Sequence, residues 1–570
     1  MKIACMLALA AGGFIASAQD DMLSFVNPLD LVYRMRPEAK VDFREGADPD
    51  VVMWEGRYWL FASKCGGYFV SDDLARWTLV RTDDLPLEEY APSVWVMDGC
   101  LYFSSRGGSV HRAVDAAAGK WERIKGNVRN TIDSKLFAED GRLFDYYGGG
   151  PDKVPLWVQE LNPATFADIG EKVPITEMDD SRFGWDVCGD YNEMTDVRPG
   201  YKEGSHMIRR GGTYYFQYAT PGTEYATYCD VALVGSSPTG PFARQRLNPF
   251  SYKSTGYAKG AGHGCTFADR HGNFWHVTTC VVRGIDRRIV MLPVFFGPEG
   301  EMWCDTAFAD WPMAIPDHRT ENPQDYRTGW MPLTYGKKVS VSSCAKVTDK
   351  GALVDENMRS VWSAATGNAG EWAEVDLGGV AEIRAVQIGF AETNNCAPWR
   401  ETGAARRWRL EVSEDGTAWK CVVDESGATG AADHPYRVLK APAMAAKIRV
   451  VCVGVPAGTT FALREIRAFG SMDMPRPQMP ESLVVERDGK DRRRARVSWK
   501  AANGAEGYVV RYGPSPDKLH LSLIVRGVSE VEVRALDTEQ DYWWTVEAFN
   551  AAGFSAAMDA QKEETSGNEH

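Results

Sequence analysis

One short pattern recurs five times in the first half of the chain and limits the fold more than any other feature. A turn residue and a glycine are followed by a variable residue, an apolar residue and an aromatic residue. The glycines are Gly56, Gly99, Gly141, Gly212 and Gly272. A two-residue turn between apolar runs is typical of a β-hairpin. The first three copies recur at about 42 residues, which is the period of propeller blades built from four short strands. The pattern predicts an all-β fold that begins with a five-bladed β-propeller.

The same repeat indicates where the chemistry lies. At a similar distance before each glycine, the innermost strand of a blade is expected to begin. Four of the five blades carry an ionisable residue there: Asp48, Asp133, Glu203 and His263. Because the innermost strands of a propeller converge on its axis, we expect these side chains to face one common site.

Short motifs surround these residues, one in each blade. They are Ala47-Asp48-Pro49, Tyr90-Ala91-Pro92, Thr131-Ile132-Asp133, Glu203-Gly204 and Gly262-His263-Gly264. With these motifs in this order, roughly residues 25–330 resemble glycoside hydrolase family 43. The resemblance implies an inverting glycosidase with Asp48 as general base, Glu203 as general acid and Asp133 as the residue that adjusts the pKa of the acid. Ser134 stands where many members of the family have proline.

Glycoside hydrolysis needs these residue types. One protonated carboxyl protonates the leaving oxygen, and one carboxylate activates a water molecule; inversion places the two about 6.5–9.5 Å apart. A third carboxylate near the acid raises the pKa of the acid. The alternative interpretation is that Asp48 and Asp133 are turn or cap residues, which is common for Asp in loops. For Asp50 we expect such a supporting role.

His263 has two possible roles. It either contacts the substrate or lies beside a metal ion or water at the propeller axis, where members of the resembling family often hold calcium. Calcium prefers oxygen ligands, so we assign no metal ligand and expect that the chemistry requires no cofactor. His206 and His276 are expected to be structural.

Three further residues are predicted to bind substrate: Tyr90, Trp185 and Arg288. Trp185 lies in the insertion 150–200, whose aromatic residues could form a sugar subsite or pack on their own blade. The pair Arg287-Arg288 could send a guanidinium towards the substrate or form a structural ion pair. Other carboxylates of the insertion could replace Asp133 in its role: Asp186, Asp190 and Glu193.

The chain is too long for one domain. A signal peptide is predicted at 1–18, so we expect a periplasmic or secreted protein. After it we expect the propeller at 19–334, a discoidin-like carbohydrate-binding β-sandwich at 335–470, a Pro-rich linker at 471–480, a fibronectin type III-like β-sandwich at 481–558 and a disordered tail at 559–570. The discoidin-like domain either binds glycans, with a structural calcium, or braces the enzyme.

Composition excludes some partners. The net charge is −14 without a basic stripe, which argues against nucleic acid. No segment after the signal peptide has the ~20 apolar residues of a membrane span. The 12 cysteines show no metal-binding spacing and are expected to be mostly reduced and buried. We expect a monomer that releases arabinofuranose, xylose or galactose from the ends of plant-type polysaccharides or oligosaccharides. The alternative is a non-catalytic glycan-binding propeller.

Overall fold

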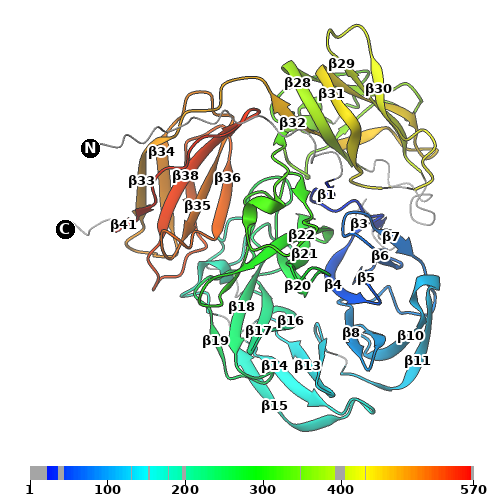
Figure 1. Ribbon diagram of the computed structural model, residues 1–570, viewed down its shortest axis with the longest axis vertical. Helices are drawn as coiled ribbons and strands as arrows, with labels where there is room; N and C mark the ends of the chain where they lie inside the picture. The colour runs from blue at the N-terminus through cyan, green and yellow to red at the C-terminus, as the bar shows by residue number, and fades with distance from the viewer. Residues whose placement is uncertain are drawn as a thin grey trace, which may run out of the picture.

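The computed structural model describes residues 22–35, 44–129, 131–151, 154–176, 179–195, 200–346, 348–391, 405–430 and 432–565. Within these ranges the chain is all-β, with four short 3₁₀ segments and no α-helix. A helix long and apolar enough to cross a membrane is therefore not found among these residues. The predicted signal peptide, 1–18, lies outside them. Figure 1 shows a propeller with a second domain beside its first and last blades and a third domain beside its fourth.

The propeller has five blades, and each blade is a sheet of four consecutive strands. The first two blades contain β4 (Ala47–Trp54), β5 (Arg57–Ser63), β6 (Tyr68–Ser71), β7 (Thr78–Val80), β8 (Ser93–Met97), β9 (Cys100–Ser104), β10 (Ser109–Asp115) and β11 (Lys120–Asn127). The third and fourth contain β12 (Lys135–Glu139), β13 (Arg142–Gly148), β14 (Leu156–Leu161), β15 (Asp168–Thr176), β16 (Glu203–Arg210), β17 (Thr213–Thr220), β18 (Cys229–Gly235) and β19 (Phe242–Arg244). The fifth contains β20 (Gly262–Ala268), β21 (Phe274–Arg283), β22 (Asp286–Phe296) and β23 (Met302–Cys304).

The repeated glycines form the first hairpin of each blade. In the first blade Trp54 pairs with Arg57, and the two turn residues between them, Glu55 and Gly56, both have positive φ angles, 50° and 74°. Such a turn matches the right-handed twist of the flanking strands. The second and third blades repeat this geometry, so the prediction of five hairpin-based blades is confirmed.

The ring closes without sharing a strand between blades. The innermost strands β4, β8, β12, β16 and β20 contact one another in order, and β20 contacts β4. Before the first blade, β1 (Ser24–Phe25) pairs with β24 (Met313–Ala314), and β2 (Arg34–Met35) pairs with β3 (Arg44–Glu45). The start of the described chain is thereby joined to the segment that follows the last blade.

The second domain is built on one eight-stranded sheet. Its strands are β25 (Met331–Pro332), β26 (Lys338–Val341), β27 (Trp362–Ser363), β28 (Trp372–Phe390), β29 (Arg407–Ser413), β30 (Lys420–Asp424), β31 (Tyr436–Gly454) and β32 (Ala462–Met472). Both predicted ends of this domain are shifted. β25, expected to belong to the propeller, pairs with β32, and β32 continues to Met472 inside the predicted linker.

The third domain is a β-sandwich of two sheets. One sheet contains β33 (Glu481–Arg487), β34 (Ala495–Lys500), β37 (Glu530–Val533) and β41 (Glu564–Thr565); the other contains β35 (Gly507–Gly513), β36 (Leu521–Val525), β38 (Trp543–Asn550), β39 (Gly553–Phe554) and β40 (Gln561–Lys562). The prediction of a disordered tail at 559–570 is wrong for 561–565. There β40 pairs with β38, and the Arg487 guanidinium donates to buried Glu563 at 2.7 Å. Residues 566–570 lie outside the described chain.

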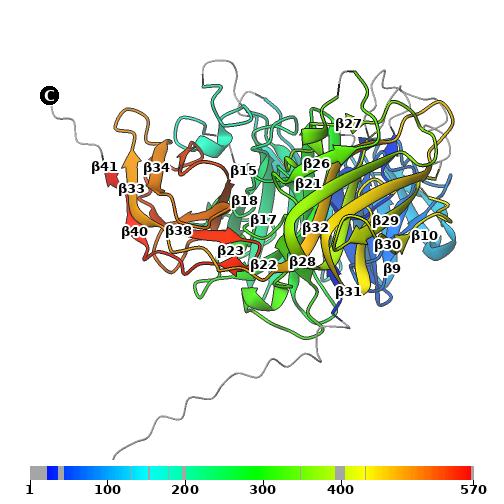
Figure 2. The same cartoon turned by 90° about the horizontal axis from the view of Figure 1, so that it is seen from above.

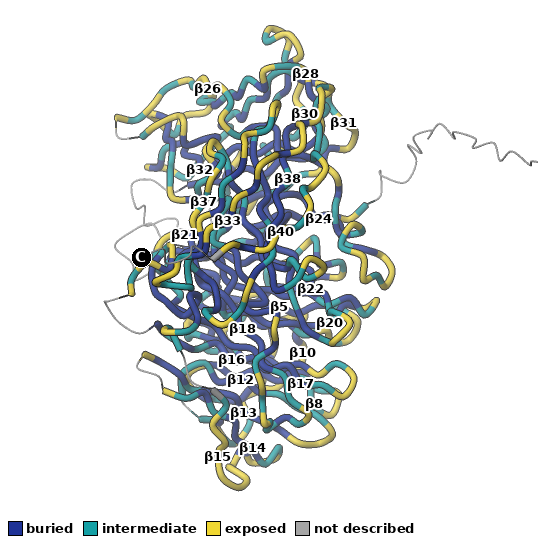
Figure 3. Tube along the Cα trace, turned by 90° about the vertical axis from the view of Figure 1, so that its left-hand side faces the viewer, coloured by how far each residue is buried: buried dark blue, intermediate teal, exposed yellow. Residues whose placement is uncertain are grey.

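The hydrophobic cores cross the domain boundaries. One buried cluster joins Trp185 and Phe216 of the propeller to Trp544 of the third domain. Another joins Trp311 to Phe469 and Phe549, and so involves all three domains. Figure 2 shows the second domain in front of the propeller and the third domain beside both, and Figure 3 shows buried chain through the middle of the molecule. Ten cysteines lie within the described residues, none of them in a disulfide, and all but Cys100, Cys344 and Cys421 are buried.

Candidate active site

Each innermost strand carries a residue in the left-handed backbone region at the end that faces the predicted site. The φ angles are 51° at Asp48, 48° at Ala91, 49° at Asp133 and 53° at His263, and in the fourth blade 65° at Gly204. The pairing register shifts at this point in the first, fourth and fifth blades. Bulges of this kind turn side chains out of the regular alternation of a strand. Glu203 lies one residue before the equivalent position, which Gly204 occupies.

Asp48 is held by three neighbouring elements. The Ser63 hydroxyl of β5 donates to Oδ2 of Asp48 at 2.6 Å, and the same hydroxyl accepts the backbone N–H of Ala91 at 2.8 Å. The Asp48 N–H donates to Thr279 Oγ1 at 3.0 Å. Nη1 of Arg287 approaches Asp48 Oδ1 at 3.4 Å. The carboxylate is therefore fixed in position and paired with a buried cation.

His263 lies between two carboxylates. Its Nδ1 is 3.3 Å from Asp48 Oδ1 and 3.7 Å from Asp133 Oδ2. The bulge that carries it is held by Asp230, whose two carboxylate oxygens accept the N–H groups of His263 and Gly264, each at 2.9 Å. The imidazole thus connects the first and third blades across the axis.

Glu203 faces a different set of groups. The Tyr228 hydroxyl donates to Glu203 Oε1 at 2.7 Å. Asp133 is tied to the same strand because its Oδ2 accepts the Gly204 N–H at 3.2 Å. One donor atom each of Asp133, Glu203 and His263 lies within 4.8 Å of the other two. Asp133 is therefore a close carboxylate neighbour of Glu203, and its charge raises the pKa of Glu203 more than that of Asp48 does.

These environments shift the two main carboxyls in opposite directions. Burial and the charge of Asp133 raise the pKa of Glu203 to about 8. Burial also opposes ionisation of Asp48, but the charges of Arg287 and His263 and the Ser63 hydrogen bond outweigh it, so the pKa of Asp48 lies below its ordinary value. At neutral pH Glu203 carries a proton and Asp48 is ionised.

Burial and neighbouring charges also shift the pKa values of Asp133 and His263. Burial raises the pKa of Asp133 above its ordinary value, although the charge of His263 lowers it in part. Burial alone would lower the pKa of His263, yet the nearby carboxylates, first Asp48 and then Asp133, hold it above its ordinary value.

Asp133, Glu203 and His263 have the spacing of a metal site, but their chemistry does not suit calcium. Calcium takes six to eight oxygen ligands, and this set offers two carboxyls and one nitrogen. Protonation of Glu203 at neutral pH weakens it further as a ligand. These three side chains alone therefore do not fit a calcium ion.

The prediction of a substrate contact is wrong for two residues, Trp185 and Arg288. Trp185 is 1% exposed, because it stacks on Phe183 with ring centroids 4.8 Å apart in the core shared with the third domain. Arg288 is fully buried and donates to Asp286 and Asp433, each at 2.6 Å. It points to the junction with the second domain, whereas its neighbour Arg287 points to Asp48.

Tyr90 lies near the site. Its ring is 5.9 Å from the Arg287 guanidinium and 4.6 Å from Lys64 Nζ, so its role as a substrate contact remains a prediction. The supporting role of Asp50 is confirmed, since it pairs with Lys135 and accepts the Val94 N–H at 2.7 Å.

The other carboxylates of the insertion have partners outside the cluster. Asp186 accepts the Thr220 hydroxyl at 2.9 Å, Asp190 pairs with Arg359 at 2.6 Å, and Glu193 accepts the Tyr191 N–H at 2.8 Å. None of the three replaces Asp133. The two histidines expected to be structural are buried and bonded within the propeller, His206 to the Thr266 carbonyl and His276 to Asp230.

Sequence reasoning missed Tyr228, Ser63 and Asp230, and chose the wrong member of the pair Arg287-Arg288. Tyr228 and Asp230 follow no repeated motif, so the sequence carries no clear signal for them. Ser63 ends the aromatic strand β5, and its position opposite Ala47 could have indicated it.

A buried proton donor and a buried carboxylate with opposed pKa shifts are what a glycoside-hydrolysing site requires. The comparisons with known proteins agree with this class. Residues 43–301 match the family model of glycosyl hydrolases family 43, and residues 338–466 match the model of the F5/8 type C domain. The F5/8 type C domain corresponds to the discoidin-like domain expected from the sequence.

A curated relative is the β-D-galactofuranosidase xynD of Aspergillus niger, which is 27% identical over 237 residues, 35% of this chain and 63% of its own length. The chain thus spans less than two thirds of that relative. A solved glycoside hydrolase shares 18% identity over 77% of this chain and 99% of its own, with a TM-score of 0.44. An arabinoxylan arabinofuranohydrolase of family 43 from Bacillus subtilis shares 16% identity over 77% and 98%, with a TM-score of 0.37. With scores this low, the fold assignment rests on the sheets described above.

Proposed function

We propose that this protein is a glycosidase that cleaves with inversion, with Glu203 as general acid, Asp48 as general base and Asp133 as the group that keeps Glu203 protonated. The observation that carries the proposal is the pair of opposed pKa shifts, Glu203 to about 8 and Asp48 below its ordinary value. Neutral pH lies between them, so acid and base are both in their working forms.

The substrate class is a plant-type polysaccharide or oligosaccharide, from whose chain ends the enzyme releases arabinofuranose, xylose or galactose. The family model over the propeller and the galactofuranosidase relative support a glycoside substrate. His263 and Tyr90 are the proposed substrate contacts, since both lie beside the carboxyl cluster. The second domain is proposed to bind glycan or to brace the propeller.

The test is sugar release from polysaccharides and aryl glycosides by the wild type and by Glu203→Gln. Substrates with poor leaving groups need the acid, so activity on polysaccharides is expected to fall by at least ~100-fold, and by much less on activated aryl glycosides. Proton NMR of the first product is expected to show inversion at the anomeric carbon.

Glu193→Gln is the matched control, because Glu193 is exposed and accepts a hydrogen bond from the backbone of its own loop. If Glu203→Gln and Glu193→Gln are equally active on polysaccharides, Glu203 is not the acid. If the wild type binds these glycans but cleaves none of them, the non-catalytic glycan-binding function replaces the proposal.

A further inference from the structure

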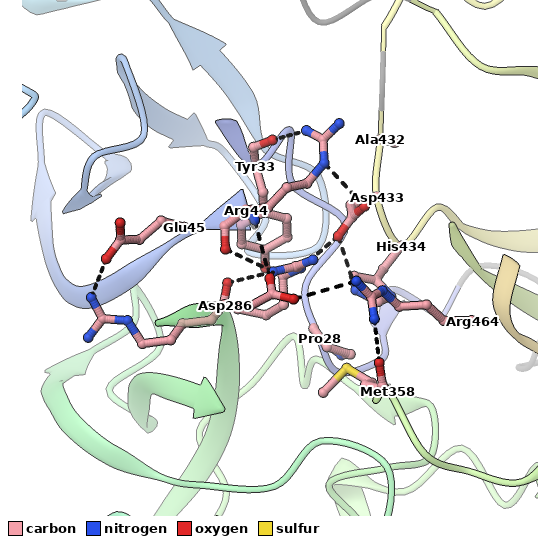
Figure 4. A network of polar contacts seen from close by, with 12 residues as sticks. Pro28, Tyr33, Arg44, Glu45, Asp286, Met358, Ala432, Asp433, His434 and Arg464 are labelled. Carbon is pink, nitrogen blue, oxygen red and sulfur yellow. Dashed lines mark hydrogen bonds and ion pairs between the residues drawn. The ribbon is translucent and has the colours of Figure 1, made fainter. Parts of the chain in front are cut away.

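A buried network of charged residues runs from Asp433 and Arg464 of the F5/8 type C domain to Glu45 of the propeller (Figure 4). Arg287, which contacts both Glu45 and Asp48, extends it to the carboxyl cluster. Its propeller side is formed by two short runs that lie together, Arg44-Glu45 of β3 and Asp286 to Arg288 at the start of β22. The Arg44 N–H donates to Asp286 Oδ1 at 3.2 Å, and Arg288 Nη1 donates to the Arg44 carbonyl at 3.1 Å. The two strands are therefore fixed to each other.

Alternation along each strand divides these charges between two faces. Glu45 and Arg287 point towards the site, where the Arg287 guanidinium contacts Glu45, Asp48 and the Thr223 hydroxyl. Arg44, Asp286 and Arg288 point towards the second domain. The same short segments thus hold a cation against the catalytic base and present charges to another domain.

The second domain supplies the carboxylate that these charges need. Asp433 Oδ2 accepts Arg288 Nε at 2.6 Å, and its Oδ1 lies 3.5 Å from Arg44 Nε and 3.4 Å from Arg406 Nη1. Asp433, Arg44 and Arg288 are all almost completely buried. Asp286 also pairs with the guanidiniums of Arg288 and Arg464, but its contact with Arg44 is to the backbone N–H. Loss of Asp433 would therefore remove counter-charge from buried cations, and such a loss forces a rearrangement.

We propose that Asp433 is a positioning residue: it acts through Arg288 and the paired strands to hold Arg287 against Asp48. This inference rests on the proposed function, because it assigns the F5/8 type C domain a part in setting the geometry of the base. It differs from a glycan-binding role, which would affect capture of polymers and leave turnover of small substrates unchanged.

The test compares Asp433→Asn with Asp30→Asn in the full chain. Asp30 pairs with Arg437 across the same domain junction at 2.7 Å. Within the described part of the chain its polar contacts are to Tyr436 and Arg437 and not to Arg287, so it controls for weaker docking. For Asp433→Asn, kcat on a small aryl glycoside is expected to fall about tenfold with KM within about twofold, as for a misplaced catalytic group. Asp30→Asn is expected to retain kcat.

A second readout does not depend on activity. His263 touches Asp48 at 3.3 Å, so its imidazole NMR signal, assigned with His263→Gln, is expected to move in Asp433→Asn and to stay in Asp30→Asn. If no glycoside is cleaved by the wild type, the proposed function fails, and this signal still decides the positioning role. An unmoved signal together with unchanged kcat in folded Asp433→Asn would overturn the inference.

If Asp433→Asn does not fold, Arg406→Gln carries the test. Arg406 contacts Asp433 from within the second domain, and its loss is expected to lower kcat in the same sense by a smaller factor. Unchanged kcat in a folded Arg406→Gln protein would then overturn the inference.

Discussion

At the scale of single residues, three neighbouring carboxyls of the site have different tendencies to ionise. Like charges close together in a poorly solvated site oppose each other's ionisation. Arg287 and Ser63 face Asp48, so that carboxylate keeps its charge. Glu203 is buried beside the carboxylate of Asp133, and together these raise its pKa by more than the charge of His263 and the Tyr228 hydroxyl lower it. The proton is therefore held where a leaving oxygen would need it.

The pH dependence follows from these shifts. With Glu203 as the proposed general acid, kcat/KM is expected to fall as pH rises through about 8. With Asp48 as the proposed general base, whose pKa is lowered, the acidic fall is expected below the ordinary range of an aspartate. In Asp133→Asn a negative charge that raises the pKa of Glu203 is lost, and the basic limb is expected to move to lower pH. In Tyr228→Phe a hydrogen bond that lowers it is lost, and the limb moves to higher pH.

The measurement is the pH profile of kcat/KM for both variants and for Asp140→Asn. Asp140 lies in the exposed hairpin turn of the same blade as Asp133, and asparagine suits such a turn, so its profile should match the wild type. Shifts of the two site variants in the same direction would contradict the assignment of Glu203 as the group that titrates.

The sequence alone does not predict which of the two arginines, Arg287 or Arg288, faces the site. Consecutive residues of a strand face opposite sides, so one arginine reaches the site and the other the domain junction. Which of the two arginines faces the site depends on the residue at which β22 begins after its turn. That start is set by the pairing of Arg283 with Asp286, which a single sequence does not reveal.

At the scale of elements, the bulges at the inner ends of the strands make the site possible. They combine a left-handed residue with a side chain turned to the axis. At Gly204 an added Cβ would also lie 2.7 Å from the His263 ring. Glycine here permits the imidazole of the fifth blade to lie against the fourth.

Gly204→Ala tests this packing. Gly211 is the matched control because its φ of 61° is similar to the 65° of Gly204, and a Cβ there would have no atom within 4 Å. Gly211→Ala is expected to cost about 1 kcal/mol from backbone strain alone. Gly204→Ala is expected to lower the unfolding free energy by more than that and to reduce kcat, as measured by denaturant unfolding and kinetics. Equal costs with unchanged kcat would mean that His263 does not need this space.

Blade architecture was predictable from the sequence because its signals are local. Hairpins such as Asp98-Gly99 and Asp140-Gly141 specify their turn type by themselves, and their repetition gives the ring. The burial of Trp185 and the pairing of β40 and β41 depend on contacts with segments far away in the chain. Local pattern therefore predicted a substrate contact at Trp185 and a disordered tail at 559–570. The first prediction is wrong, and the second is wrong for 561–565.

At the scale of the whole molecule, the three domains share cores and buried ion pairs. The propeller loop that carries Gly184 is bonded to the third domain, because the Gly184 N–H donates to the Leu536 carbonyl at 2.9 Å. The Arg182 guanidinium adds an ion pair to Asp537 at 3.1 Å. Contacts of this kind couple the unfolding of the parts.

Gly184→Ala is expected to disrupt that junction, since its Cβ would lie 2.0 Å from the Arg534 carbonyl oxygen. Gly212→Ala, with no atom within 4 Å of the added Cβ, is expected to be close to neutral. Calorimetry of the wild type should show one transition. Gly184→Ala should split that transition or lower its Tm by more than ~2 °C, the shift expected from about 2 kcal/mol in a chain of this size. Separate transitions in the wild type would show that the domains unfold independently.

Alternate residues of strand β22 contact Asp48 and the neighbouring domain, and this limits how the domains of the protein can be exchanged. An accessory domain of a multidomain enzyme is commonly treated as an exchangeable cassette in chimeras. Here a grafted domain without a carboxylate at the place of Asp433 would remove an ion-pair partner of Arg44 and Arg288. We therefore expect an active chimera only when the propeller and its own F5/8 type C domain are transferred together.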